Sequence, residues 1–326
     1  MKKNKTIKVG VIGIGHLGST HLRLLLESDS YRVMGCFDKN TSLKSKISSD
    51  LSFYDNVTEL IIKCDALFVC SNTPSHFEMV KLCLLNNKHV FVEKPITTTL
   101  EEAVELVKLT EKNNLIGQVG HVERFNPAIT SVLNIIDNPK FIECHRLAEF
   151  NPRGNDVSVV LDLMIHDIDI VLKLVNSNIK NISANGVAVI SDSPDITNAR
   201  VEFENGAVAN FTASRISLKN MRKTRLFQNN AYVSVDFLEK KSEVVKITDF
   251  QDKKDNYAMV IENLKGEKKQ IYYSNPESKP VNSIVEEHNN FAKSILNKSS
   301  PLVSFRDGLN ALELAIKIIN KANGNS

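Results

Sequence analysis

The chain has 326 residues, of which 42% are hydrophobic and 24% charged, and its 41 Lys and Arg nearly balance its 38 Asp and Glu, for a net charge of +3. At about 150 residues per domain, this length predicts two domains with hydrophobic cores of their own. The composition is typical of a globular protein and excludes a disordered chain, a collagen-like repeat and a strongly basic nucleic-acid-binding coat.

The cysteines and the apolar segments bear on the cellular compartment. Five cysteines are widely spaced and never form a CxxC pair, which argues against a disulfide framework and against a zinc site. The first residues faintly resemble a signal peptide, but Lys8 and Gly13 interrupt their apolar stretch. No run of about 18 uncharged apolar residues occurs, so no membrane span is expected. We therefore expect a cytoplasmic protein with reduced thiols.

Up to about Gly120, short apolar runs alternate with longer segments of helical spacing. The runs lack alternation between apolar and polar residues, which is typical of parallel strands buried on both faces. Strands are predicted at residues 7–13, 32–38, 66–71, 89–93 and 115–119, and helices at 16–28, 75–86 and 99–113. This order predicts an α/β domain of the Rossmann type at residues 1–122, built on a doubly wound parallel sheet.

Beyond Gly120, many segments alternate apolar and polar residues. Strands are predicted at residues 141–150, 182–190, 199–203, 207–214, 224–227, 231–237, 244–249, 257–263 and 270–274, and helices at 157–175, 281–297 and 309–323. Three connections, at 204–206, 228–230 and 265–267, have the composition of hairpin turns. We expect an α+β domain at residues 123–326, with a large, mainly antiparallel sheet and helices on one face.

A glycine-rich motif, Gly-Ile-Gly-His-Leu-Gly, follows the first predicted strand and opens the first predicted helix. Gly13 allows a tight turn, Gly15 lets a pyrophosphate approach backbone N–H groups, and Gly18 permits close packing of helix and strand. Asp38 ends the second strand, where a carboxylate can bind an adenosine ribose. No arginine stands beside it to hold a 2′-phosphate, so NAD is favoured, although Lys39 leaves NADP open. The alternatives are a different dinucleotide and a glycine turn that binds nothing.

Two further strands end in polar residues at the carboxyl edge of the predicted sheet, where ligands bind in such folds. The Ser-Asn-Thr segment after the third strand is expected to close over the ribose on the nicotinamide side, and also to start the next helix. Lys94, in Glu93-Lys94-Pro95, is expected to hydrogen-bond an alcohol oxygen and a ribose, with Glu93 tuning its charge. The predicted cofactor contacts are Gly13, Gly15, His16, Leu17, Gly18, Asp38, Ser71, Asn72, Thr73, His76, Glu93 and Lys94.

Asp162 and His166 are four residues apart in the predicted helix 157–175, so they share a face and can form a hydrogen bond. A histidine oriented by a carboxylate suits a general base, because its pKa of about 6.5 lets it take up and return a proton near neutral pH. The alternatives are a helix-cap network formed by Asp167 and Asp169, and a metal site formed by His166 with the aspartates. No second His or Cys stands at ligand spacing nearby, so no metal is predicted.

These motifs together resemble the family of glucose-fructose oxidoreductase, inositol dehydrogenase and MocA. The segment 305–313 also resembles the closing helix of that family, so the resemblance spans the whole chain. In the family, the corresponding lysine, aspartate and histidine carry the dehydrogenation of sugars and cyclitols. The resemblance therefore implies catalytic roles for Lys94, Asp162 and His166, and a homodimer or homotetramer formed through the C-terminal sheet.

Segments 120–127, 145–154 and 159–169 resemble, more narrowly, the UDP-N-acetylglucosamine 3-dehydrogenase branch, although Glu149 departs from the proline expected there. The resemblance implies oxidation of the sugar's 3-hydroxyl, followed by an aminotransferase that leads to a 2,3-diamino sugar for lipid A. Other enzymes of the family, acting on UDP-N-acetylglucosaminuronate or inositol, are alternatives. A non-enzymatic NAD-binding regulator is disfavoured, because Lys94 and His166 are present.

A UDP-linked substrate carries a diphosphate, for which nearby arginines are suitable ligands. The predicted substrate contacts are Arg124, Asn126, Arg146, Arg153 and His166. A separate basic cluster consists of Arg215, Lys219, Arg222, Lys223 and Arg225. Because this cluster is short and the chain nearly neutral, we interpret it as a solvated sheet edge or an interface, and expect no nucleic-acid partner.

Overall fold

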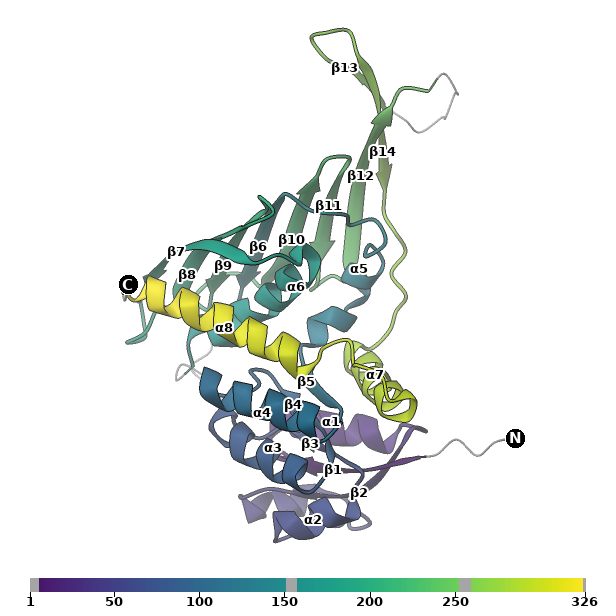
Figure 1. Ribbon diagram of the computed structural model, residues 1–326, viewed down its shortest axis with the longest axis vertical. Coiled ribbons are helices and arrows are strands. Elements are labelled where there is room, and N and C mark those ends of the chain that lie inside the picture. The colour runs from purple at the N-terminus through teal and green to yellow at the C-terminus, as the bar shows by residue number, and fades with distance from the viewer. Residues whose placement is uncertain (1–5, 151–156, 252–258, 325–326) are drawn as a thin grey trace, which may run out of the picture. The chain divides into compact units, whose positions relative to one another are not determined.

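The computed structural model describes residues 6–150, 157–251 and 259–324 (Figure 1). The chain forms two compact units, the first made of Met1–Val122 and Asn282–Glu313 and the second of Glu123–Val281 and Leu314–Ser326. The division after Val122 coincides with the predicted one. The segment Asn282–Glu313 was expected in the second domain, and it belongs to the first unit instead. Within the described ranges, no helix is long and apolar enough to cross a membrane.

The first unit is built on a five-stranded parallel sheet with the order β2-β1-β3-β4-β5. The strands are β1 (Ile7–Ile12), β2 (Tyr31–Phe37), β3 (Ala66–Val69), β4 (His89–Glu93) and β5 (Gly117–Gly120). Since β2 lies on one side of β1 and β3 on the other, the winding direction changes between β1 and β3. Ligands of doubly wound folds bind at the carboxyl ends of the strands at this point.

The helices of the first unit include two elements that the sequence analysis did not predict. The helical elements of this unit are α1 (His16–Leu26), α2 (Val57–Lys63), α3 (His76–Leu85), α4 (Leu100–Lys112), α7 (Ser283–Asn297), the first half of α8 (Phe305–Ala322), and the 3₁₀ turns η1 (Thr41–Lys46) and η2 (Thr73–Ser75). The start of α4 is a capping box formed by Thr99 and Glu102. The elements η1 and α2 are short, and they were missed because neither shows a sustained apolar period.

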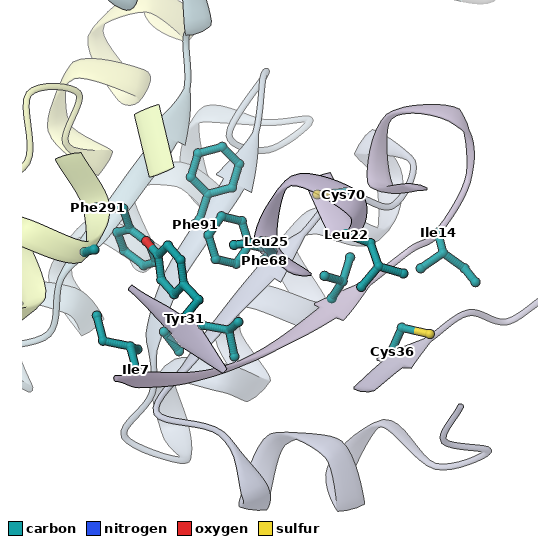
Figure 2. Close-up of a cluster of buried hydrophobic side chains, with 14 residues drawn as sticks. Ile7, Ile14, Leu22, Leu25, Tyr31, Cys36, Phe68, Cys70, Phe91 and Phe291 are labelled. Atoms are coloured by element: carbon teal, nitrogen blue, oxygen red, sulfur yellow. The ribbon is translucent and has the colours of Figure 1, made fainter. Parts of the chain in front are cut away.

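Aromatic packing explains why α7 belongs to the first unit (Figure 2). The rings of Phe68 on β3 and Phe91 on β4 stack with their centroids 4.9 Å apart. Phe291 of α7 packs edge-on against Phe68 at 5.6 Å, and it is fully buried. Burying a large apolar side chain stabilises a fold by about 1.5–3 kcal/mol, so this contact holds α7 against the five-stranded parallel sheet.

The second unit is built on a nine-stranded sheet with the order β13-β14-β12-β11-β10-β6-β9-β8-β7. The strands are β6 (Phe141–Leu147), β7 (Ile179–Val187), β8 (Ile196–Phe203), β9 (Val208–Ser214), β10 (Met221–Gln228), β11 (Ala231–Asp236), β12 (Lys241–Asp249), β13 (Met259–Glu262) and β14 (Lys268–Ser274). Of the pairs in this sheet that the structure describes, β6 and β9 run parallel and the others antiparallel. The predicted α+β architecture is thus confirmed.

Helices pack on one face of this sheet, as the alternation of buried and half-exposed residues along β6 and β8 requires. The helix α6 (Ile165–Val175) contacts β6 and β9, and the short α5 (Pro127–Thr130) contacts β11 and β12. The hairpin glycines Gly206 and Gly266 have φ of +81° and +79°, which agrees with the predicted turns. Residues 257 and 258 of one predicted strand lie outside the described residues.

The basic cluster lies mainly on β10, which is an interior strand between β11 and β6, so the expected sheet edge is wrong and the alternative, an interface, stays a prediction. Four of its five cations lie within 4 Å of carboxylates of neighbouring segments. Lys223 lies 3.1 Å from Asp236 on β11, and Arg225 lies 3.5 Å from Glu143 on β6. These two pairs are half-exposed cross-strand contacts, which contribute little stability each and offset part of the positive charge of the cluster.

Candidate functional site

The glycine motif forms the loop between β1 and α1, and two of its glycines are required by the fold itself. Gly13 has φ of +86°, and a Cβ atom there would lie 2.5 Å from the backbone nitrogen of Ser71. A Cβ atom on Gly18 would overlap the carbonyl oxygen of Gly13. These positions therefore hold the loop against the end of β3 and bring α1 close to β1, as the sequence predicts.

Gly15 differs from the other two, because a Cβ atom there would meet nothing within 4 Å. Gly15 is the N-cap residue of α1; within the described structure no side chain caps this helix, and its first turn holds no acidic residue. His16 and Leu17 are exposed in that turn. Backbone N–H groups at the positive end of a helix suit a phosphate, so the loop fits the predicted pyrophosphate of NAD.

Asp38 connects this loop to the end of β2. One oxygen of its carboxylate accepts a hydrogen bond from the backbone N–H of Ile14, and the other from that of Asn40, each at 2.8 Å. A carboxylate can accept about four hydrogen bonds, so capacity remains for the hydroxyl groups of a ribose. The carboxylate would also repel a 2′-phosphate, which favours NAD.

A cavity of about 180 Å³ lies at this switch point of the sheet. It is lined by Ile12, Gly13, Gly15, Phe37, Asp38, Lys39, Cys70, Ser71, Asn72, Ser75 and Met79. The structure thus brings the glycine loop, the carboxylate and the Ser-Asn segment together within one unit. These are the groups that the sequence analysis assigned to the cofactor.

His76 was predicted to contact the cofactor, but its side chain is buried, with 1% of its surface exposed. Its ring nitrogens lie 2.9 Å from the carbonyl oxygens of Ser71 and Pro95, which follow β3 and β4. Burial lowers the pKa of His76, although hydrogen bonds to the two backbone groups oppose this effect. His76 therefore ties two strand ends together, and a direct contact with the cofactor is not what this geometry favours.

Lys94 is half-buried and directly follows β4. Glu93 is buried before it, and its carboxylate accepts a hydrogen bond from the backbone N–H of Lys94 at 3.2 Å. The other oxygen of Glu93 lies 2.8 Å from Nε2 of His21 on α1. Burial alone would raise the pKa of Glu93, but the hydrogen bond to His21 and the charges of His21 and Lys94 lower it below its usual value.

In the second unit, Asp162 and His166 lie on two different kinds of helix. Residues Val160–Met164 form a π-helical turn, and His166 is the second residue of α6. The sequence analysis predicted one continuous helix at 157–175, and the structure corrects this. Asp162 is exposed and His166 is half-buried. Single π-helical turns inside α-helices are frequent at functional sites, so this departure supports a role for the segment.

Two of the three arginines predicted to bind substrate are held by buried carboxylates. Arg146 donates hydrogen bonds to both oxygens of Asp167 at 3.1 and 2.8 Å, and to Glu123 at 2.9 Å. Its side chain is only 3% exposed, and the two carboxylates raise the pKa of its guanidinium, although burial opposes them. This geometry favours a structural role for Arg146 over the predicted diphosphate contact.

Arg124 binds Asp169 in the same two-pronged manner, with distances of 2.6 and 2.9 Å. Asn126 is also buried; it caps α5 and donates to Glu123 and to the carbonyl oxygen of Phe237. Asp167 and Asp169 thus form ion pairs that fix the first turns of α6, in place of the cap network considered from the sequence. Arg153 lies outside the described residues.

No group of three His, Cys, Asp or Glu side chains converges as a metal site requires anywhere in the described ranges. The sequence analysis gave no role to three buried histidines of the first unit, His21 on α1, His121 directly after β5 and His288 on α7. The only signal for His21 was its position on the apolar face of the helix that follows the glycine loop. Such a histidine is more often part of a core, and its partner His288 is distant in sequence.

Comparisons with known proteins agree with this arrangement. A family model described as "Oxidoreductase family, NAD-binding Rossmann fold" matches residues 7–121, and one described as "GFO/IDH/MocA C-terminal domain" matches residues 138–232. The UDP-N-acetylglucosamine 3-dehydrogenase of Acidithiobacillus ferrooxidans is 34% identical over 235 residues, covering 71% of this chain and 74% of that protein. The myo-inositol 2-dehydrogenase of Thermotoga maritima is 25% identical over 331 residues, covering 94% of each chain.

Solved structures give the same result at the level of the fold. The structure of UDP-N-acetylglucosamine 3-dehydrogenase from Acidithiobacillus ferrooxidans matches with a TM-score of 0.88 and 26% identity, covering 98% of this chain and 99% of that one. The myo-inositol 2-dehydrogenase of Lactobacillus plantarum matches with a TM-score of 0.77 at 17% identity, covering 99% and 98% of the two chains, so it supports the fold alone.

Proposed function

Because this chain belongs to the Gfo/Idh/MocA family of oxidoreductases and is an NAD-dependent dehydrogenase, we propose that it oxidises the 3-hydroxyl group of UDP-N-acetylglucosamine to a ketone. The main support for this substrate is the relative of that activity, which is 34% identical to this chain. The glycine loop and Asp38 support the cofactor, because the N-terminus of α1, which no described side chain caps, can donate N–H groups to a pyrophosphate and the Asp38 carboxylate can accept hydrogen bonds from a ribose.

In this proposal, the glycine loop and Asp38 would hold NAD, which would supply the acceptor for the hydride that leaves C3 of the sugar. Lys94 donates a hydrogen bond to the 3-oxygen and stabilises the negative charge that builds on it, which is a large contribution where water is excluded. The imidazole of His166 accepts the proton of the 3-hydroxyl, and Asp162 orients that ring. The products are a 3-keto sugar nucleotide, NADH and the proton taken up by His166. These three roles are proposed from the sequence motifs. Lys94 belongs to the first unit, and Asp162 and His166 belong to the second.

The diphosphate of the substrate requires cations other than the two arginines that are held in buried ion pairs. Of the three arginines predicted from the sequence, we therefore direct the test of diphosphate binding to Arg153. The cytosol is the compartment we propose for the reaction, since all five cysteines are free and buried. We also propose a homo-oligomer formed through the large sheet, and an aminotransferase that consumes the ketone.

The first experiment measures the NADH absorbance of the purified protein with NAD and UDP-N-acetylglucosamine. It is run with and without a sugar-nucleotide aminotransferase and glutamate, which remove the unstable ketone. We expect NADH to accumulate when the trap is present, and Lys94→Ala and His166→Ala to lower kcat by about 10²- to 10⁴-fold. Silence with the trap present, while calorimetry shows NAD binding, would contradict the proposed substrate.

Matched controls separate chemistry from general damage. Lys108→Ala removes an exposed lysine of α4, and His145→Ala removes a half-buried histidine of β6 in the same unit as His166. Both are expected to keep wild-type kcat. A second candidate function, oxidation of a free cyclitol, is favoured by the match to myo-inositol 2-dehydrogenase along 94% of both chains. NADH formation with inositol or with UDP-N-acetylglucosaminuronate, and none with UDP-N-acetylglucosamine, would reassign the substrate.

A further inference from the structure

Three buried ionisable side chains of the first unit form a series of hydrogen bonds that ends at the backbone N–H of Lys94. Nε2 of His21 lies 2.8 Å from the carboxylate of Glu93, and Nδ1 of His21 lies 2.8 Å from Nε2 of His288. His21 is fully buried, and His288 and Glu93 are 2% and 9% exposed. Three separate elements, α1, β4 and α7, contribute one residue each, so the arrangement depends on the packing of α7 against the sheet.

The hydrogen-bonding partners of the three side chains determine which of their atoms carry protons. A carboxylate only accepts hydrogen bonds, so Nε2 of His21 carries a proton and donates it to Glu93. Burial lowers the pKa of His288 well below its usual value, and a charge on His21 lowers it further, so His288 is neutral at pH 7. One proton is then shared between Nδ1 of His21 and Nε2 of His288. Glu93 stays ionised because this donor offsets the cost of its burial.

The surrounding elements fix the three groups in place. The hydroxyl of Tyr31 on β2 donates to the backbone carbonyl of His288 at 2.7 Å, which anchors α7. A Cβ atom on Gly120 of β5 would lie 2.9 Å from both oxygens of the Glu93 carboxylate. Glycine at that position therefore leaves the space that the carboxylate occupies. The second oxygen of Glu93 accepts a hydrogen bond from the backbone N–H of Lys94. The series of hydrogen bonds from His288 through His21 and Glu93 therefore ends at the backbone of this lysine.

We propose that His21 is a positioning residue that acts through Glu93 to fix the main chain and the charge environment of Lys94. The inference rests on the proposed function insofar as Lys94 is the group that binds the reacting oxygen. None of the three buried residues needs to touch substrate in this scheme. A chain of fixed hydrogen bonds defines the position of Lys94 more tightly than a loop at a strand end could, and a misplacement of about 1 Å can cost about 100-fold in rate.

Two substitutions of His21 separate this role from simple packing. The amide nitrogen of Gln can take the place of Nε2, so His21→Gln keeps the donor to Glu93 and loses the contact with His288. Asn can take the place of Nδ1, so His21→Asn keeps a partner for His288 and removes the side-chain donor to Glu93. We expect His21→Asn and Glu93→Gln to lower kcat by about 10- to 100-fold with little change in KM, and His21→Gln to recover most of the loss.

A readout that needs no substrate distinguishes failure of this inference from failure of the proposed function. Competitive acetylation read by mass spectrometry compares the reactivity of the Lys94 amine with that of exposed Lys108 in each folded variant. Loss of the negative charge on Glu93 favours the neutral amine, so Lys94 in His21→Asn and Glu93→Gln should react about threefold faster or more, and in His21→Gln as in wild type. Equal Lys94 reactivity in all four proteins, with NAD binding intact, would overturn the inference. If the acetylation pattern holds while wild type leaves UDP-N-acetylglucosamine unchanged, only the proposed function fails.

Discussion

Alanine substitutions at the three glycines of the loop should give three different results. Gly13→Ala places a side chain at φ of +86° and 2.5 Å from the backbone of Ser71. The backbone conformation costs about 1–2 kcal/mol and the collision about 1–3 kcal/mol, so the free energy of unfolding should fall by about 2–5 kcal/mol. Gly18→Ala, which overlaps the carbonyl oxygen of Gly13, should be at least as damaging.

Gly15→Ala should leave the fold intact and weaken cofactor binding. The residue has φ of −62° and open space around it. Ala is less favoured than Gly at an N-cap by about 0.5–1 kcal/mol, and the lower entropy of its unfolded chain stabilises the fold by a similar amount, so stability should change by less than about 0.5 kcal/mol. Its methyl group occupies the approach to the helix end, so the Kd for NAD should rise at least about tenfold, or about 1.4 kcal/mol.

Urea unfolding followed by circular dichroism measures the first effect, and calorimetric titration with NAD measures the second. Gly206→Ala is the matched control, because this hairpin glycine has φ of +81° and no neighbour within 4 Å. It should lose only the conformational part, about 1–2 kcal/mol, and keep wild-type affinity for NAD. Wild-type NAD affinity in Gly15→Ala, or equal losses of stability in Gly13→Ala and Gly206→Ala, would refute the reasoning.

Two further predictions concern protonation and thiol chemistry. One oxygen of Asp195 accepts three backbone N–H bonds within 3.0 Å, which hold its pKa well below the usual 3.8 in spite of burial. The resulting stability is present above about pH 4 and is lost as the pH falls towards the folded pKa, so the Tm gap between wild type and Asp195→Asn should be largest near neutral pH and shrink below pH 4. Burial raises the pKa of the thiols, that of Cys36 to about 11 and that of Cys64 to about 12, so a disulfide reagent at pH 8 should label the native protein slowly and all five cysteines after unfolding. A cysteine that reacts as fast in the native protein as in urea would contradict the buried placement.

The elements that local sequence determines were predicted well. All five predicted strands of the first unit are confirmed. The strands β1, β3 and β4 are apolar runs that are buried at nearly every residue, as their composition predicts. The placement of α7 could not be read in this way. Its amphipathic pattern shows that one face is buried, but the choice of sheet depends on Phe291 packing against Phe68, more than 200 residues away in the sequence.

The same distinction applies to the candidate site: features that depend on neighbouring residues were predicted, and features that depend on distant partners were not. The glycine loop was predicted because a turn, an open helix end and a close approach are properties of neighbouring residues. The roles of the arginines depend on partners that arrive from a distant helix, and the sequence gives no distance between them. A charge argument could have found them, since Asp167 and Asp169 lie among apolar residues of a predicted helix and each needs a cation when buried.

The buried ion pairs also decide what the second unit can offer to a sugar nucleotide. If Arg146 turned its guanidinium to a diphosphate, Asp167 would lose its buried ion-pair partner and Glu123 would keep only Arg222, at 3.9 Å, at a cost of about 3–5 kcal/mol. Arg146→Met should therefore lower the free energy of unfolding by about that amount, and leave the KM for UDP-N-acetylglucosamine near wild type where the variant is still folded. Arg153→Ala should do the reverse, with a KM raised about tenfold and unchanged stability. The exposed pair of Arg200 and Glu202 provides the control, since Arg200→Met should change stability by less than about 1 kcal/mol. A raised KM with unchanged stability in Arg146→Met would show that this guanidinium binds substrate after all.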